Sequence, residues 1–218
     1  MVFVDSWVTI VDGVQDTVAQ DFQRATRVFA ALSMDFRISK FILTRDQTRA
    51  ILGSDGKLAL TGGPTQFTHN LPIGAANSRE IPQPVSDQNG RFTQEVWAAI
   101  RDWTDIGGLH IFYVPDFDPP TGEGGITLRV GDEIDPIIFV NQTANLDMVR
   151  NTRGRRGVLE HEIGHAFGLP DVSRANVLMT GIISSDASDA GTALSHAELD
   201  TIRSSRLLDV VTTWGQRQ

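Results

Sequence analysis

The stretch HEIGHAFGLPD, residues 161–171, decides how this chain folds around its candidate site. Positions four apart on an α-helix differ by about 40° around the axis, so His161 and His165 project from one face, a turn apart. Two imidazoles in this relation can both bind one zinc ion at about 2.0–2.1 Å. Glu162 lies about 100° round from His161, where it flanks the metal without binding it and can act as a general base toward a water molecule.

A candidate for the third ligand follows the helix at Asp171, where a helix-end cap or turn residue is the alternative interpretation. Gly168 can adopt a positive φ and end the helix, and Pro170 prevents the helix from resuming. Asp171 then lies on a chain that has turned back beneath the metal, and a carboxylate binds zinc at about 2.0–2.2 Å. The sequence therefore predicts one catalytic zinc ion held by His161, His165 and Asp171.

A short apolar turn, Asn-Val-Leu-Met-Thr at residues 176–180, is centred on Met179. The pattern His-Glu-x-x-His-x-x-Gly-x-x-ligand followed by such a turn resembles the metzincin clan of zinc peptidases, over residues 155–180. Most metzincins have histidine as the third ligand, whereas snapalysin-type bacterial peptidases are similar to this chain in using aspartate after Gly-Leu-Pro. The resemblance implies hydrolysis of peptide bonds by a metal-activated water, with Met179 below the site as a floor that does not bind the metal.

Two further features bear on the comparison with metzincins. Many members of the clan have a tyrosine just after the methionine, but the only tyrosine here is Tyr113, so that donor is absent. The clan's edge strand, which pairs with an extended substrate, corresponds to residues 126–130, where apolar and polar residues alternate as in a half-exposed strand. Ile126, Thr127 and Leu128 are accordingly candidate substrate-pairing residues, and a plain amphipathic edge strand is the alternative.

The remaining sequence predicts a mixed α/β (α+β) fold. Apolar alternation and β-branched runs indicate strands, and apolar residues at three- and four-residue steps indicate helices. The clearest helix start is Ser195, an N-cap with Glu198 three residues later. The resemblance implies a metzincin-like twisted mixed sheet of about five strands, an active-site helix, a methionine turn and a C-terminal helix. Strands are expected at residues 7–11, 36–44, 109–114, 126–130 and 136–141, and helices at 16–32, 92–103, 152–167 and 196–208.

Residues 1–218 are expected to form a single metallopeptidase catalytic domain, because the sequence shows no repeat and no clear linker. Residues 61–90 are rich in Gly, Pro, Asn, Ser and Gln and have no period. They predict a long surface loop or an insertion, and loops of this length are often functional.

Composition excludes several classes of protein. A net charge of −8 argues against a general nucleic-acid surface, and the basic cluster at residues 150–156 is interpreted as a solvated helix start. No apolar run approaches the roughly 20 residues of a membrane-spanning helix. The absence of cysteine excludes disulfides, thiolate ligands and a cysteine nucleophile. The expected partner is a protein or peptide substrate, with no nucleic acid and no membrane, and the sequence does not indicate an oligomeric state.

The N-terminal residues lack the positive and long apolar regions of a signal peptide. A soluble protein is expected, either cytoplasmic or secreted after removal of a leader.

Three alternatives stay open at this point. Glu198 is the candidate third ligand if the chain is a gluzincin-type peptidase. A non-catalytic binding module with a structural zinc is the second, although such a site needs no base at Glu162. Calcium is a second metal to consider at Asp116, Asp118 and Glu123, where an ordinary acidic turn is the simpler interpretation because the spacing fits no EF-hand loop.

Overall fold

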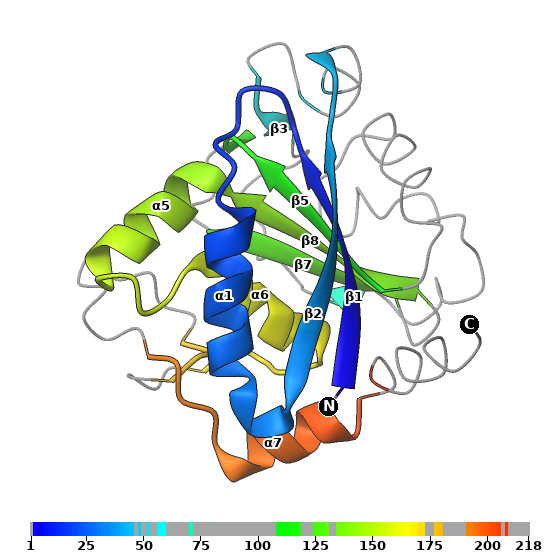
Figure 1. Cartoon of the computed structure of the whole chain (residues 1–218), viewed down its shortest axis with the longest axis vertical. Coiled ribbons are helices and arrows are strands. Elements are labelled where there is room, and N and C mark those ends of the chain that lie inside the picture. The colour runs from blue at the N-terminus through cyan, green and yellow to red at the C-terminus, as the bar shows by residue number, and fades with distance from the viewer. Residues whose placement is uncertain are drawn as a thin grey trace.

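The computed structural model describes residues 2–45, 48, 52, 56–59, 70–71, 108–118, 124–130, 134–172, 177–180, 191–205 and 208. Their strands form a six-stranded sheet in the order β2-β1-β5-β8-β7-β4 and a two-stranded sheet, β3-β6 (Figure 1). The elements are β1 (Val2–Ile10), α1 (Val18–Val28), the 3₁₀ helix η1 (Ala30–Leu32), β2 (Met34–Ile42), β3 (Leu58–Ala59), β4 (Asn70–Leu71), β5 (Leu109–Val114), β6 (Phe117–Asp118), β7 (Gly125–Val130), β8 (Ile134–Asn141), α5 (Gln142–Asn151), α6 (Val158–Ala166) and α7 (His196–Arg203).

The large sheet confirms the predicted mixed α/β class with five main strands, to which the two-residue β4 is added. All of its pairings are parallel except that of β7 with β8, which is antiparallel. β5 lies in the middle of the sheet, and each of its residues is buried. The strand predicted at residues 109–114 is therefore confirmed, and its burial extends to the polar His110.

Two helices pack side by side on one face of the sheet (Figure 1). α1 lies against β2 and buries Val18, Phe22 and Ala25, and α6 lies against β7 and β8. The helix predicted at residues 16–32 is therefore confirmed in place, but its α-helical part ends at Val28. The 3₁₀ turn that follows closes at Ser33, which has a left-handed φ of 51°.

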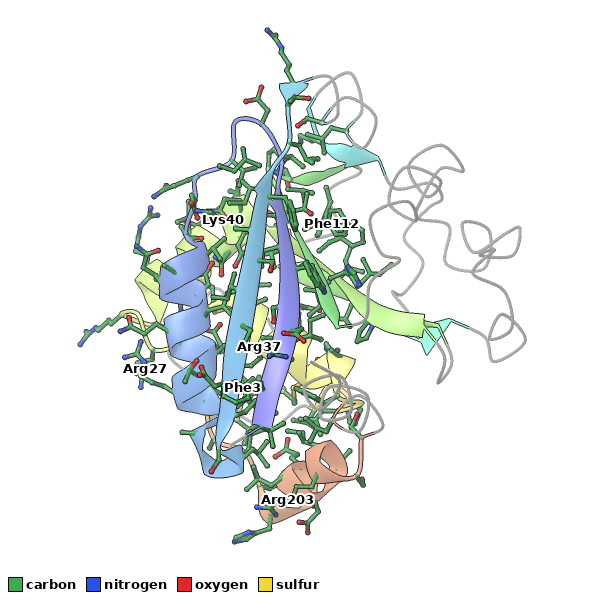
Figure 2. All side chains as sticks on the ribbon, turned by 45° about the vertical axis from the view of Figure 1, so that its right-hand side comes forward. Phe3, Arg27, Arg37, Lys40, Phe112 and Arg203 are labelled. Carbon is green, nitrogen blue, oxygen red and sulfur yellow. The ribbon has the colours of Figure 1, made fainter. Side chains whose placement is uncertain are left out.

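β2 is an edge strand, and it carries charged side chains that discourage pairing with another chain. Arg37 forms an ion pair with Asp5 at 2.7 Å. The Arg37 guanidinium carbon also lies 5.4 Å from the centroid of the exposed Phe3 ring (Figure 2). The same side chain therefore covers an apolar residue and places a charge on the edge of the sheet.

The helix predicted at residues 152–167 was wrong at its start. α6 begins at Val158, and a separate helix, α5, covers residues 142–151. The break is a turn in which Arg153 and Gly154 have φ values of 54° and 77°. α5 has a weak apolar pattern, since only Met148 is apolar among its buried residues, and this explains why periodicity did not reveal it. The residue that marks the start of α5 is its N-cap, Asn141, whose side chain accepts a hydrogen bond from Ala144 N at 3.1 Å.

Two predicted segments lie outside the described residues: the helix at 92–103, and residues 61–90 apart from β4. Within the part of the chain that the structure describes, no helix is long and apolar enough to cross a membrane.

Candidate metal centre

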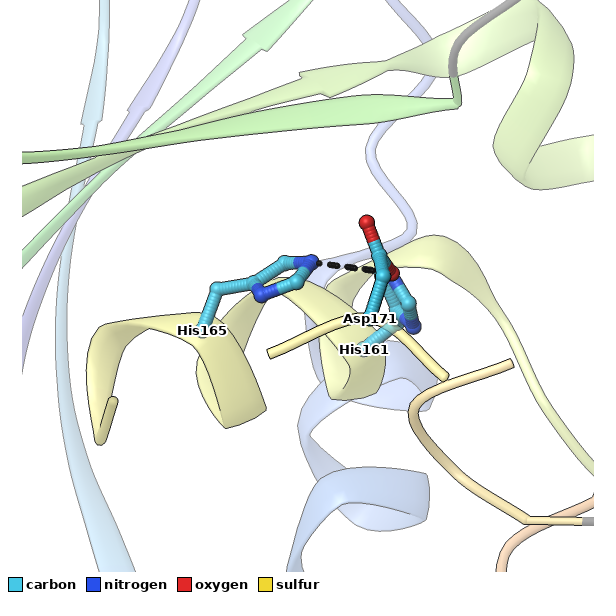
Figure 3. A group of neighbouring side chains, drawn as sticks. All are labelled: His161, His165 and Asp171. Carbon is cyan, nitrogen blue, oxygen red and sulfur yellow. Dashed lines mark hydrogen bonds and ion pairs between the residues drawn. The ribbon is translucent and has the colours of Figure 1, made fainter. Parts of the chain in front are cut away.

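Three side chains converge beside α6 (Figure 3). His161 Nε2 lies 3.0 Å from His165 Nε2. Asp171 Oδ1 lies 3.2 Å from His161 Nε2 and 3.4 Å from His165 Nε2. Tetrahedral coordination at about 2.0–2.1 Å places neighbouring ligand atoms about 3.3 Å apart. The three atoms therefore have the dimensions of one face of a zinc tetrahedron.

The rings of the two histidines are oriented from behind by main-chain carbonyls. His165 Nδ1 lies 2.8 Å from Leu169 O, and His161 Nδ1 lies 3.0 Å from Leu178 O. A carbonyl only accepts, so in each contact Nδ1–H is the donor and the lone pair of Nε2 faces the other ligands. Such contacts select the tautomer that a metal requires.

Asp171 reaches the histidines because the chain reverses directly after α6. Gly168 has a φ of 95°, a left-handed conformation that favours glycine. Gly168 N donates to His165 O at 2.8 Å, and Leu169 N donates to Gly164 O at 3.0 Å. This is the Schellman arrangement, which satisfies the last carbonyls of a helix while turning the chain. The side chain of Asp171 remains 42% exposed, so the site is open to solvent on this side.

Met179 lies directly beneath the site helix and is fully buried. A Cβ added to Gly164 would lie 2.3 Å from Met179 Sδ, so the methionine packs against the bare backbone of α6. The segment after Asp171 is tied to the same turn, since Val172 N donates to Met179 O at 2.8 Å. The turn thereby supports both α6, which carries the two histidines, and the chain segment that carries Asp171.

Glu162 is 3% exposed and its side chain lies against β7. Thr127 Oγ1 lies 2.7 Å from Glu162 Oε2 and 3.0 Å from Glu162 O. The expected alternation of exposed and buried side chains was wrong at Ile126 and Thr127, which are both fully buried. The side chain of Leu128 lies outside the described residues. Along the outer edge of β7, β4 pairs with Arg129 and Val130.

The alternative ligand Glu198 is placed elsewhere. Its carboxylate accepts hydrogen bonds from Ser195 N at 2.6 Å and from Ser195 Oγ at 2.7 Å, which completes the predicted capping box of α7. Among the described residues, the one group of acidic and histidine side chains placed to hold a metal is that of His161, His165 and Asp171.

The calcium alternative gains no geometric support. Asp116 is paired with Lys57 at 3.3 Å and accepts a hydrogen bond from Asn141 Nδ2 at 2.8 Å. Burial raises the pKa of Asp116, but its hydrogen bonds and Lys57 outweigh burial and lower the pKa below its ordinary value. The side chains of Asp118 and Glu123 lie outside the described residues.

Arg156 corrects the interpretation of residues 150–156 as a solvated cluster. Its side chain is buried, and Nη2 lies 2.9 Å from His161 Nδ1. Burial lowers the pKa of Arg156, and the nearby carboxylates of Glu160, Glu162 and Asp171 oppose that shift. A guanidinium only donates, so this contact and the Leu178 carbonyl require different tautomers of His161, and the carbonyl contact is the one that leaves Nε2 free.

A second buried network anchors the start of α6 against α1. Arg24 Nε donates to Glu160 Oε1 at 2.8 Å, and Arg24 also pairs with Asp21. Tyr113 donates its hydroxyl to Asp21 Oδ2 at 2.8 Å, so the only tyrosine of the chain serves this network. Burial raises the pKa of Glu160, and Gly157 N donates to its carboxylate at 2.9 Å. The network holds Glu160 in place, and the adjacent residue is the first histidine.

No protein-family model matches this sequence, and no curated protein matches it either. Two solved structures are distantly similar. Archaemetzincin from Methanopyrus kandleri is 15% identical with a TM-score of 0.44, and the match covers 98% of this chain and 96% of that one. A zinc-dependent peptidase from Methanocorpusculum labreanum is 11% identical with a TM-score of 0.39, covering 90% and 99%. Likeness at this level assigns no role to any residue of this chain.

Proposed function

We propose that this chain is a zinc-dependent endopeptidase of the metzincin type. The observation that carries the proposal is the triangle of Nε2, Nε2 and Oδ1 atoms from His161, His165 and Asp171, with sides of 3.0, 3.2 and 3.4 Å. Nitrogen and carboxylate ligands suit zinc, and three protein ligands with an open fourth position are typical of a catalytic site. The exposure of Asp171 provides the opening that a substrate needs.

In this proposal each group has one task. Zinc, when bound, polarises the carbonyl of the scissile peptide bond and lowers the pKa of the attacking water. Glu162 accepts the proton of that water and passes it to the leaving amine. Met179 supports the floor of the site and contacts no reacting atom.

The substrate is proposed to bind as an extended strand. β7 pairs with β8 on one side through residues 125–128 and 130. On its other side the described pairing with β4 is confined to Arg129 and Val130. The main chain of Ile126, Thr127 and Leu128 is therefore the segment of β7 that we propose to pair with an extended peptide.

A proteolysis assay tests the proposed function. The purified protein is expected to cleave a flexible, unfolded protein, to lose this activity when a chelator removes the metal, and to regain it when zinc is added. The control is a chelated sample to which magnesium is added, since magnesium prefers oxygen ligands. A zinc-loaded protein that cleaves no unfolded substrate would contradict the proposal and favour the binding-module alternative.

Zinc binding is expected to weaken as the pH falls. Burial lowers the pKa of His165, but the hydrogen bond to Asp171 and the charges of Glu162 and Asp171 outweigh burial and raise the pKa above its ordinary value. A raised pKa keeps the proton on the imidazole to higher pH, and this proton must leave before zinc binds.

Calorimetric titrations with zinc between about pH 8 and about pH 5.5 would measure this effect, because histidines titrate in that range. Below the raised pKa of His165, each pH unit is expected to lower the affinity about tenfold per released proton. Repeating the titration in buffers of different ionisation enthalpy would count the protons. An affinity that stays constant across the range would contradict histidine ligation.

A further inference from the structure

β7 lies across α6 and forms a cradle for the side chain of Glu162. Gly125 and Thr127 are two residues apart, so they belong to the same face of the strand. A Cβ added to Gly125 would lie 2.6 Å from Glu162 Cγ and 2.8 Å from Cδ. Glycine at this position therefore lets the strand approach the glutamate stem, and Thr127 meets its carboxylate.

The hydrogen bond from Thr127 to Glu162 is buried. Thr127 Oγ1 has a single proton and two acceptors within reach, at 2.7 Å (Oε2) and 3.0 Å (the main-chain oxygen of Glu162). Hydroxyl–carboxylate bonds are shorter and stronger than bonds between neutral groups, which favours the carboxylate as the acceptor. Among the described residues, Thr127 is the one side chain that hydrogen-bonds this carboxylate.

We infer that Thr127 is a positioning residue for the general base. By holding Oε2, its hydroxyl orients a flexible side chain and leaves Oε1 to receive the proton of the attacking water. The inference rests on the proposed function, and it gives β7 two tasks. The side chain of Thr127 orients the base, and the main chain of residues 126–128 is the proposed edge for the substrate.

The test replaces Thr127 by valine, which keeps the branched shape and strand preference but removes the donor. Thr127→Val is expected to retain one equivalent of zinc and a KM within about twofold of wild type, while kcat falls about 10–100-fold, as for other outer partners of a catalytic group. Thr127→Ser restores the hydroxyl and is expected to recover most of kcat. Thr9→Val makes the same change at a buried threonine of β1 in the same sheet and is expected to leave kcat unchanged.

A second measurement tests the contact without using activity. In chelated protein, Thr127→Val and Glu162→Ala remove the same hydrogen bond, so the double variant should lower the unfolding midpoint by less than the sum of the two single changes. Additive changes would overturn the inference, as would an unchanged kcat in Thr127→Val, a serine variant as slow as the valine variant, or loss of zinc from Thr127→Val. If the wild-type protein cleaves no substrate, the proposed function fails by itself. The unfolding midpoints of the single and double variants still decide whether Thr127 holds Glu162.

Discussion

Replacing Glu162 by glutamine is expected to lower kcat for peptide hydrolysis by about two orders of magnitude or more, while the protein still folds and holds zinc. Glutamine has the size of glutamate, and its carbonyl oxygen can still accept the hydrogen bond from Thr127, which is 2.7 Å long in the structure. The amide cannot accept the proton of the attacking water. Single-turnover cleavage of an unfolded protein, with zinc content measured on the same sample, would separate the loss of the base from the loss of the metal.

Glu160→Gln is the comparison variant for this experiment. It makes the same chemical change two residues earlier on α6, where the carboxylate is buried and paired with Arg24 at 2.8 Å. We expect Glu160→Gln to lower the unfolding midpoint, because it leaves the buried guanidinium of Arg24 partly unpaired. The proposed base, Glu162, is still present in this variant. Equal cleavage by the wild type and by Glu162→Gln would show that Glu162 is not the base.

Removal of a ligand should have the second large effect. His165→Ala and Asp171→Ala each remove one of the three proposed ligand atoms. Each is expected to lower the zinc affinity by more than the factor of about 10–100 that is typical when only a residue supporting a ligand is lost. Asp171→His should largely preserve binding, since imidazole is an equally suitable zinc ligand and a side chain that is 42% exposed leaves room for a ring. Competition with a chromogenic chelator would measure the dissociation constants.

Glu198→Ala is the control for ligand loss, because its carboxylate caps α7 through Ser195. It is expected to keep full zinc affinity and to lose some helix stability. The opposite pattern, in which Glu198→Ala loses zinc and Asp171→Ala retains it, would support the gluzincin alternative. Full zinc occupancy in His165→Ala would contradict the proposed site itself.

The predicted and observed helix boundaries show which sequence patterns predict a helix reliably. The capping box at Ser195 and Glu198 was predicted and is present, because it depends on residues three apart. α5 was missed, and the start of α6 was placed six residues too early, at Thr152 instead of Val158. The buried face of α5 is mostly polar, so it shows little apolar period. The start of α6 is set by the preceding turn, in which Arg153 and Gly154 have positive φ values.

The sequence by itself determined the geometry that arises within one helix and its end. The four-residue spacing of His161 and His165, with the left-handed Gly168 after them, is enough to predict that two imidazoles and Asp171 lie together, because these relations follow from local dihedral preferences. Tertiary structure alone decided what surrounds them. Thr127 approaches Glu162 from 35 positions away, and Arg24 reaches Glu160 from 136 positions away. Such contacts depend on how the sheet and helices pack, and no local pattern encodes which buried polar groups will meet.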